Sequence, residues 1–247
     1  GDEPRQIDWK LYARSDKFFV REAERDSPLT AWVLLDASAS MAQTDAARPG
    51  WSRLSAGKAM AACVFELACR QGDRFGLIAV NGSGLQVVNA GAGAKHRDAC
   101  PWGLSPATAQ GVWPSESVCR PIWERIGANA LALMIGDGFD DQALALAERL
   151  AAARRELFHI RILTAEERDF PFAGGQRFVD AETGAELLTD APASRDQYLQ
   201  QFALASRDLA LRMAASGIRH VETFLDRPLD EPLRQLFGHS KRRGAEA

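Results

Sequence analysis

Trp32-Val33-Leu34-Leu35-Asp36-Ala37-Ser38-Ala39-Ser40-Met41 is the stretch that decides the fold. It begins as an apolar run of strand length and ends in a carboxylate, which two hydroxyls follow at alternate positions. A buried strand that stops at Asp36 leaves Asp36, Ser38 and Ser40 in the turn beyond its carboxyl end, where open α/β sheets bind ligands. Three hard oxygen donors favour a hard divalent cation such as Mg²⁺ or Mn²⁺. The same pattern is also typical of a strand followed by a serine-rich helix cap.

The composition indicates a globular protein with a sizeable core. Of the 247 residues, 46% are hydrophobic and 26% are charged, and 30 basic residues stand against 33 acidic ones. This length predicts one large α/β domain, or one domain with an appendage. The net charge of −3 gives no support for a protein that binds nucleic acid or an anionic membrane.

The cysteines and the hydropathy pattern indicate the compartment. None of the four cysteines forms a C-x-x-C pair, so they are typical of reduced, mostly buried thiols in a cytosolic protein. No apolar run approaches the length needed to span a bilayer, and no signal peptide opens the chain. We therefore expect a cytoplasmic protein without membrane insertion.

Strand-like and helix-like segments alternate along the chain. The buried strands are predicted at residues 30–35, 75–80, 130–135, 158–163 and 218–224, with a short strand at 85–88 that pairs with the second of them. The helices are predicted at residues 52–71, 117–126, 142–156, 195–216 and 232–237. This alternation predicts an α/β fold with a doubly wound, mostly parallel sheet.

Other segments fall outside the alternation. Residues 1–29 are predicted to form a small N-terminal arm, which we expect to be truncated at its start. Residues 241–247 are predicted to form a basic, flexible tail. Residues 176–188 predict an inserted β-hairpin. Residues 91–114 have no period of either kind, so we expect a functional loop there. The rest, residues 30–240, is expected to form one domain.

A second predicted strand also ends in a carboxylate, because Ile135 is followed by Gly136-Asp137-Gly138. If both strands are central, their ends meet at the switch point of the sheet. One cation could then be held directly by Ser38 and Ser40, and through water by Asp36 and Asp137. Such an ion keeps an open position, which an Asp or Glu of a partner protein could fill.

At this point the sequence resembles a known kind of site. Asp36-Ala-Ser38-Ala-Ser40-Met41, together with Ile135-Gly136-Asp137-Gly138, looks like the metal-ion-dependent adhesion site of von Willebrand factor A domains. The resemblance implies a von Willebrand factor A-like (Rossmann-like) fold. It carries the role of metal ligand to Asp36, Ser38, Ser40 and Asp137.

Two further stretches resemble one bacterial group with such domains, the domain-of-unknown-function fifty-eight family. They are Gly1-Asp-Glu-Pro-Arg-Gln-Ile-Asp-Trp-Lys-Leu-Tyr-Ala-Arg14 and the predicted hairpin Phe178-Val-Asp-Ala-Glu-Thr-Gly-Ala-Glu186. Members of that family usually accompany MoxR-type AAA+ ATPases. The resemblance therefore implies a non-enzymatic interaction module whose partners are such an ATPase and a client protein. The pair would act in chaperone-like assembly or maturation of the client.

The threonine that completes the adhesion site in integrin-type domains has no clear counterpart in this sequence. It should precede the helix before the Asp137 strand, where Thr108, Ser115 and Ser117 are the candidates. Ser117 lies best for the helix start, so we assign it as the candidate fifth ligand. An N-cap is the equally good alternative role for this serine.

The main alternative is an enzyme, a Mg²⁺-dependent phosphotransferase or phosphatase of haloacid dehalogenase type. Gly136-Asp-Gly-Phe-Asp-Asp141 looks like the late acidic motif of that superfamily, with Asp36 as the nucleophile and Lys58 as the phosphate-binding lysine. That chemistry needs a second acid two residues after the nucleophile, where this chain has Ser38. A serine hydrolase or a dinucleotide site is not expected, because neither G-x-S-x-G nor G-x-G-x-x-G is present around the first strand.

Overall fold

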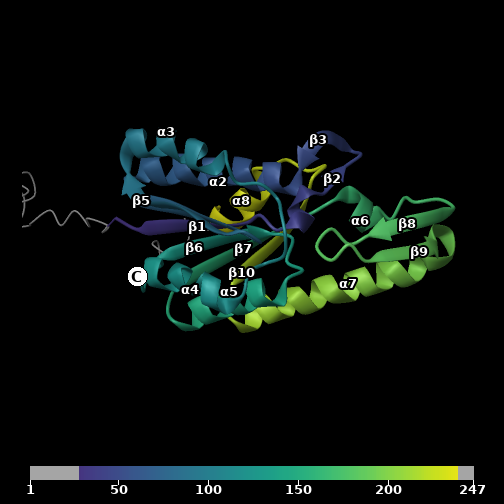
Figure 1. The fold of residues 1–247 in the computed structure, drawn as a ribbon. Coiled ribbons are helices and arrows are strands. Elements are labelled where there is room, and N and C mark those ends of the chain that lie inside the picture. Colours follow the sequence, from purple (N-terminus) through teal and green to yellow (C-terminus); the bar gives the residue numbers. More distant parts are fainter. Residues whose placement is uncertain (1–27, 239–247) are drawn as a thin grey trace, which may run out of the picture.

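A six-stranded sheet organises the chain, in the order β10-β7-β6-β1-β4-β5 (Figure 1). The structure is a computed structural model that describes residues 28–238. The strands are β1 (Thr30–Asp36), β4 (Arg74–Asn81), β5 (Gly84–Ala92), β6 (Leu131–Gly136), β7 (Glu156–Leu163) and β10 (Arg219–Phe224). All neighbours pair in parallel except β4 and β5, which form a hairpin.

This order makes the sheet doubly wound. Numbered along the chain, its six strands follow the order 3-2-1-4-5-6, and the chain reverses its direction across the sheet between β1 and β6. The predicted α/β fold with a doubly wound, mostly parallel sheet and an inserted β-hairpin is confirmed. The predicted basic tail and nearly all of the predicted arm lie outside the described residues.

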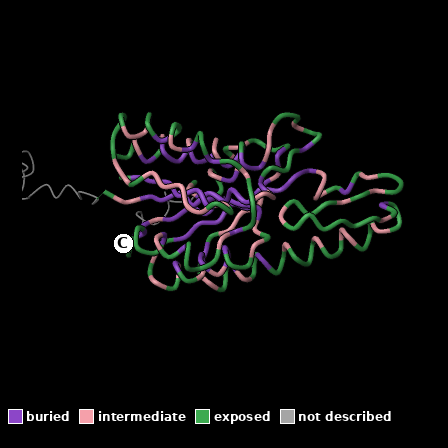
Figure 2. Tube along the Cα trace, viewed as in Figure 1, coloured by how far each residue is buried: buried purple, intermediate pink, exposed green. Residues whose placement is uncertain are grey.

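Strand β1 lies at the centre because its side chains are apolar on both faces. All of its residues after Thr30 are buried, as expected of a parallel strand covered by helices on both sides. It pairs with β4 on one side and β6 on the other, so that Leu35 lies between Ala79 and Ile135. Figure 2 shows the buried stretches gathered in this central layer.

Helices cover both faces of the sheet. They are α2 (Arg53–Gln71), α3 (Gly93–Leu104), α4 (Glu116–Arg125), α5 (Asp141–Ala152), α6 (Ala165–Asp169), α7 (Ala191–Ala215) and α8 (Glu231–Phe237). α2, α3 and α8 enclose one core, which contains Leu35 and Phe65. α4, α5 and α7 enclose the other, which contains Trp32 and Leu150. None of the helices within residues 28–238 is long and apolar enough to cross a membrane.

Helix α2 begins and ends where its capping residues predict. The Ser52 hydroxyl accepts the N–H of Ser55 at 3.1 Å, and Gly72 ends the helix in the left-handed region with φ of +78°. Near its start, a Cβ on Gly57 would lie 2.7 Å from the Leu35 side chain. Only glycine therefore lets α2 approach the carboxyl end of β1 this closely.

The segment at residues 91–114 differs from the prediction, because it contains helix α3 and is not one long loop. Pro101 and Gly103 interrupt the helical period that a prediction needs. Cys100 and Leu104 are nonetheless buried against the same core as α2, so tertiary packing forms the helix where local propensity does not indicate one. The small sheet of β2 (Thr44–Asp45) and β3 (Arg48–Ser52) was also not predicted.

The predicted hairpin is confirmed as β8 (Gly175–Val179) and β9 (Glu186–Asp190). It forms a separate two-stranded sheet beside the N-terminal part of α7, beyond the carboxyl end of the main sheet (Figure 1). An aromatic cluster attaches it to the helices. The Phe170 ring stacks on Tyr198 with centroids 4.4 Å apart and on Phe178 at 5.8 Å.

Truncating Leu35 to alanine should destabilise the fold strongly, because this side chain is fully buried between β1, α2 and β6. We expect Leu35→Ala to lower the free energy of unfolding by about 2–5 kcal/mol in urea titrations. Leu188→Ala, at a leucine that is 75% exposed, serves as the control and should stay close to the wild type. Equal losses in the two variants would contradict the central position of β1.

Candidate functional site

The carboxyl ends of β1 and β6 lie side by side, and each carries a buried aspartate. Asp36 ends β1 and Asp137 directly follows β6, with exposed fractions of 3% and 1%. A Cβ on Gly136 would lie 2.9 Å from the Asp36 Cβ, so a larger residue there would push the two strand ends apart. Both acids therefore lie at the switch point of the sheet, where the sequence placed them.

The loop after β1 brings two hydroxyls to the same place. The Oγ atoms of Ser38 and Ser40 lie 3.0 Å apart, and the Ser38 N–H donates to Asp36 Oδ1 at 2.8 Å. Ser38 precedes a 3-10 turn at Ala39–Ala42, but its side chain makes no capping hydrogen bond. A capping role therefore does not explain this serine, and its hydroxyl can act as a ligand.

A buried arginine that the sequence did not indicate joins the two strand ends. Arg53 Nη1 donates to Asp137 Oδ2 at 3.0 Å and to the Ser40 carbonyl at 3.3 Å, and Nη2 pairs with Glu167. The Arg53 side chain is only 4% exposed. Its fixed charge offsets that of Asp137, and its three contacts hold the serine loop, the end of β6 and helix α6 together.

A second buried arginine supports the backbone of Asp137. Arg161 Nε donates to the Asp137 carbonyl at 2.8 Å, and Nη1 pairs with Glu222 at 2.7 Å. The ring of Phe139 lies 5.0 Å from the Arg161 guanidinium and 5.7 Å from that of Arg53, within the range of cation–π contacts. A charged residue inside the apolar strand β7 was the sequence signal for this role.

Asp36 carries the uncompensated negative charge of the site. Burial, together with the charge of Asp137, raises its pKa to about 7, although the N–H and hydroxyl of Ser38 act in the opposite direction. The hydrogen bonds of Arg53 reach Asp137, and within residues 28–238 no Arg or Lys side chain pairs with Asp36. A cation near Asp36 would therefore be held favourably at neutral pH.

The donor set suits a hard cation. Asp36, Ser38, Ser40 and Asp137 offer only oxygen atoms, as Mg²⁺ and Mn²⁺ prefer. Within residues 28–238, no three Asp, Glu, His or Cys side chains form a metal-binding group by themselves. The two serine hydroxyls would therefore have to be ligands, which is the arrangement that the sequence predicts.

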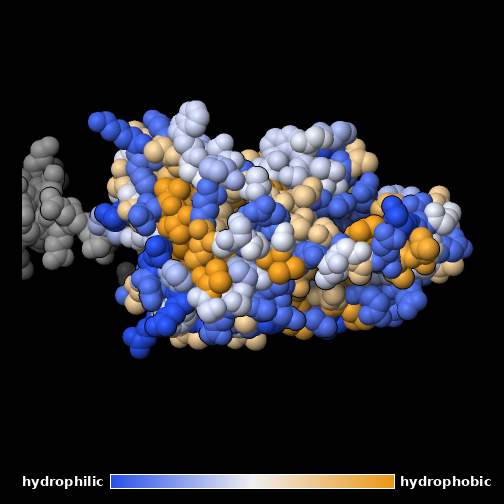
Figure 3. All heavy atoms as spheres, viewed as in Figure 1, coloured by the Kyte–Doolittle hydropathy of each residue, from blue (hydrophilic) through white to orange (hydrophobic). Residues whose placement is uncertain are grey.

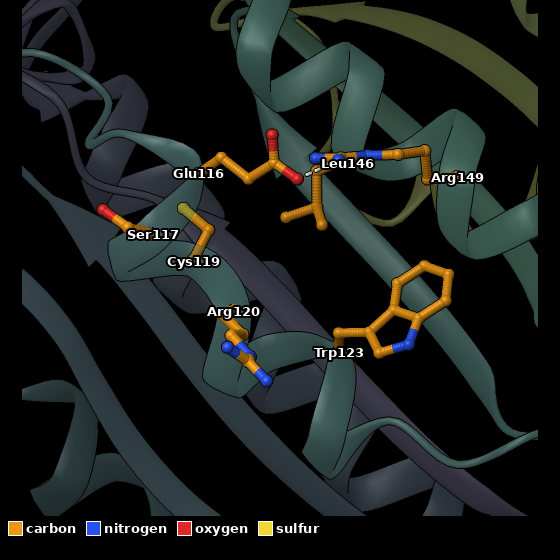
Figure 4. Close-up of a pocket in the computed structure, with 7 residues that line it drawn as sticks. All are labelled: Glu116, Ser117, Cys119, Arg120, Trp123, Leu146 and Arg149. Atoms are coloured by element: carbon orange, nitrogen blue, oxygen red, sulfur yellow. Dashed lines mark hydrogen bonds and ion pairs between the residues drawn. The ribbon is translucent and has the colours of Figure 1, made fainter.

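Ser117, the candidate fifth ligand, lies in the first turn of α4. Its Oγ is 3.0 Å from that of Ser115, and the hydrogen bonds of the described residues connect it with none of the other four. It lines a surface pocket of about 350 Å³ between α4 and α5, with its hydroxyl turned away from Trp123 (Figure 4). The residues bonded to the serine loop are instead Gln110 and Gly111, so the role of Ser117 stays a prediction.

Proteins of similar sequence match most of the chain. A family model described as "Protein of unknown function DUF58" matches residues 1–208. The uncharacterized protein Rv1480 of Mycobacterium tuberculosis is 29% identical over 257 residues, which covers 100% of this chain and 78% of that protein. The uncharacterized protein Mb1516 of Mycobacterium bovis matches with the same identity and coverage.

Two solved structures have distantly similar shapes. The conserved hypothetical protein BatB from Bacteroides thetaiotaomicron is 12% identical with a TM-score of 0.49, covering 84% of this chain and 98% of that one. The SpRpn10 VWA domain is 13% identical with a TM-score of 0.48, covering 85% and 95%. The fold assignment itself rests on the strand order of the sheet.

Replacing Asp36 should change how stability depends on pH in the metal-free protein. Because the folded-state pKa of about 7 exceeds the ordinary value of 3.8, the folded protein keeps a proton that the unfolded chain releases. Stability is therefore lost as the pH rises between these values. In EDTA, the wild type should lose on the order of 2–4 kcal/mol of unfolding free energy through Asp36 between about pH 4 and about pH 8. Asp36→Asn should lack this part of the loss.

The measurement is the free energy of urea unfolding across that pH range, in EDTA, for both proteins. Carboxylates far from the site contribute equally to both curves, so the difference between the curves reports Asp36 and its coupling to Asp137 and Glu182. Parallel curves would show that Asp36 is ionised in the folded protein and already compensated.

Proposed function

The chain belongs to the family described as protein of unknown function DUF58, and from this premise we propose that it is a non-enzymatic protein-interaction module that binds through a metal-ion-dependent adhesion-type site. The observation that carries the proposal is the convergence of two buried acids and two neighbouring hydroxyls at the switch point of the sheet. Among the described residues, Asp137 is paired with a buried cation and Asp36 is not.

The four oxygen-bearing side chains would have different roles in holding the ion. Ser38 and Ser40 would hold a Mg²⁺ or Mn²⁺ ion directly, and Asp36 and Asp137 would hold it through water. The ion would supply an open coordination position for an Asp or Glu of a partner protein. Arg53 pairs with one oxygen of Asp137. Its positive charge would offset part of the negative charge around the ion, which would leave the ion receptive to an incoming carboxylate.

The phosphotransferase alternative lacks its further parts. Lys58, which would have to bind phosphate, donates to the carbonyl of Ala107 at 2.6 Å and to that of Ser105 at 3.5 Å. Ser38 occupies the position of the second acid and cannot act as a general acid–base at neutral pH. These contacts favour binding over phosphoryl transfer.

We further propose that the partner is a MoxR-type AAA+ ATPase, and that the pair assists the assembly or maturation of a client protein. This part rests on the family to which the chain belongs. One feature of the site suits a protein partner. The ring of Phe139, two residues after Asp137, is 55% exposed and offers an apolar contact beside the metal position.

Cation binding is the first test of the proposal. Titration calorimetry with Mn²⁺ should show one site in the wild type, no binding in Asp36→Ala, and weaker binding in Ser40→Ala by about 10- to 100-fold. Asp208→Ala, which removes an exposed acid on α7, should bind like the wild type.

The fold of each variant is checked by its unfolding transition in EDTA. A wild type that binds no Mn²⁺ would contradict the metal site. Turnover of para-nitrophenyl phosphate that disappears in Asp36→Ala would contradict the non-enzymatic reading and favour the phosphatase.

Partner binding is the second test. The MoxR-type ATPase encoded in the same genome, immobilised in an interferometry experiment, should bind the wild type in Mg²⁺. Its affinity should fall by at least about tenfold, or about 1.4 kcal/mol, in EDTA or with Asp36→Ala. An affinity that is the same in Mg²⁺ and EDTA would show that any association uses another surface.

A further inference from the structure

The turn of the β8–β9 hairpin half-buries an unexpected residue, Glu182. Every residue from 179 to 188 is exposed except Glu182. Leu187 and Leu188 of the same hairpin are 63% and 75% exposed, and apolar side chains show on the surface at this end of the molecule (Figure 3). Glutamate is among the side chains that are least often buried, because its charge loses hydration. The inward direction of Glu182 therefore requires a compensating contact.

The turn is ordered by its own hydrogen bonds. Asp180 Oδ1 accepts the N–H groups of Glu182 at 2.8 Å and of Thr183 at 3.2 Å. The Gly184 N–H donates to the Asp180 carbonyl at 2.9 Å, with a φ of +71° that favours glycine. The turn is directed toward the carboxyl end of the main sheet (Figure 1). The backbone of Glu182 is thus fixed in the orientation that turns its side chain inward.

Glu182 faces the serine loop. Burial and the charge of Asp137 raise the pKa of its carboxyl group above the ordinary value, and the nearby hydroxyls of Ser38 and Ser40 act in the opposite direction. The backbone places the turn and the loop together as well. A cavity of about 700 Å³ is lined by Ser40 on the side of the sheet and by Asp180 and Ala181 on the side of the hairpin.

Glu182 adds a further negative charge to a site whose nearby arginine is already paired with other acids. Its carboxylate contributes to the raised pKa of Asp36. Arg53, the guanidinium beside the site, already pairs with Asp137 and Glu167. A cation at the two hydroxyls would offset the charge of this third acid. Such a cation agrees with the oxygen donors of the site.

We propose that Glu182 is an internal ligand of the site, by which the hairpin places the chain's own carboxylate at the open coordination position. The proposal rests on the proposed function, because it concerns the same cation. Its consequence is regulatory: an acid of a partner protein must displace Glu182, and with it the turn of the hairpin. Within the described residues, the hydrogen bonds of residues 180–185 join the turn to itself. Through the cation, Glu182 would tie the turn to the main sheet.

Calorimetry with Mn²⁺ alone tests the role of Glu182. Glu182→Gln should weaken Mn²⁺ binding by about 10- to 100-fold. Glu182→Asp keeps the charge but shortens the side chain, and should weaken binding nearly as much if the carboxylate is a ligand. Glu186→Gln is the matched control. It makes the same change on the same hairpin, at a half-exposed residue that pairs with Arg177 at 3.3 Å, and should leave the affinity unchanged.

Hydrogen exchange supplies a readout that does not depend on affinity. Saturating Mn²⁺ should slow amide exchange in residues 180–186 of the wild type and of Glu186→Gln, but not of Glu182→Gln. Unfolding transitions in EDTA confirm that the variants keep the fold.

The outcomes separate this proposal from the proposed function. Wild-type binding of Mn²⁺ that Glu182→Gln and Glu182→Asp both retain would overturn the internal ligand and leave the cation site standing. A wild type that binds Mn²⁺ without protection of the hairpin would do the same. Absence of Mn²⁺ binding in the wild type would overturn both. Weakening by Glu182→Gln but not by Glu182→Asp would show a long-range charge effect only, which also overturns the ligand.

Discussion

The structure depends on one buried ion pair, between Arg53 at the start of α2 and Asp137 at the end of β6. A carboxylate with an exposed fraction of 1% is stable only with a partner, and removal of one partner from such a pair costs about 3–5 kcal/mol. The same guanidinium also reaches the Ser40 carbonyl and Glu167. It therefore fixes the strand end, the serine loop and α6 relative to one another. Two acids can lie side by side at the switch point because α2 begins with this arginine.

The pair compensates one acid and leaves the other open. If both aspartates had cationic partners, their charges would be compensated within the protein and a metal ion would not be needed. Here Arg53 bonds Asp137, whereas Asp36 has a pKa of about 7 and, among the described residues, accepts the N–H of Ser38 and pairs with no Arg or Lys. Uncompensated buried charge lowers stability, and natural proteins keep it mainly where it serves a function. The asymmetry between the two acids therefore supports the proposed binding site at this strand end.

The features that short stretches of sequence encode could be predicted, whereas contacts between residues far apart in the chain could not. The apolar run before Asp36 and the strand before Asp137 each carry their own signal, so the sheet and the paired acids could be predicted. Arg53 lies 84 positions from Asp137 and 114 from Glu167, and next to the cap Ser52 it looks like a solvated helix start. Glu182 stands in a polar turn whose usual place is the solvent. Helix α3 was missed for a related reason, since burial of Cys100 and Leu104 forms it despite Pro101.

The β8–β9 hairpin could be predicted from the sequence, but the direction of its side chains could not, because its apolar residues are exposed and its acid is turned inward. Leu187 and Leu188 face outward and Glu182 faces inward, although solvation alone would favour the opposite arrangement. The proposed internal ligand would account for the half-buried acid, and a partner-binding surface would account for the exposed leucines. A partner that covers the leucines and supplies its own acid to the cation would satisfy both surfaces in one step. Displacement of Glu182 would then cost little, because one carboxylate would replace another at the same ion. The hairpin would therefore favour partners that make both contacts over those that offer an acid alone.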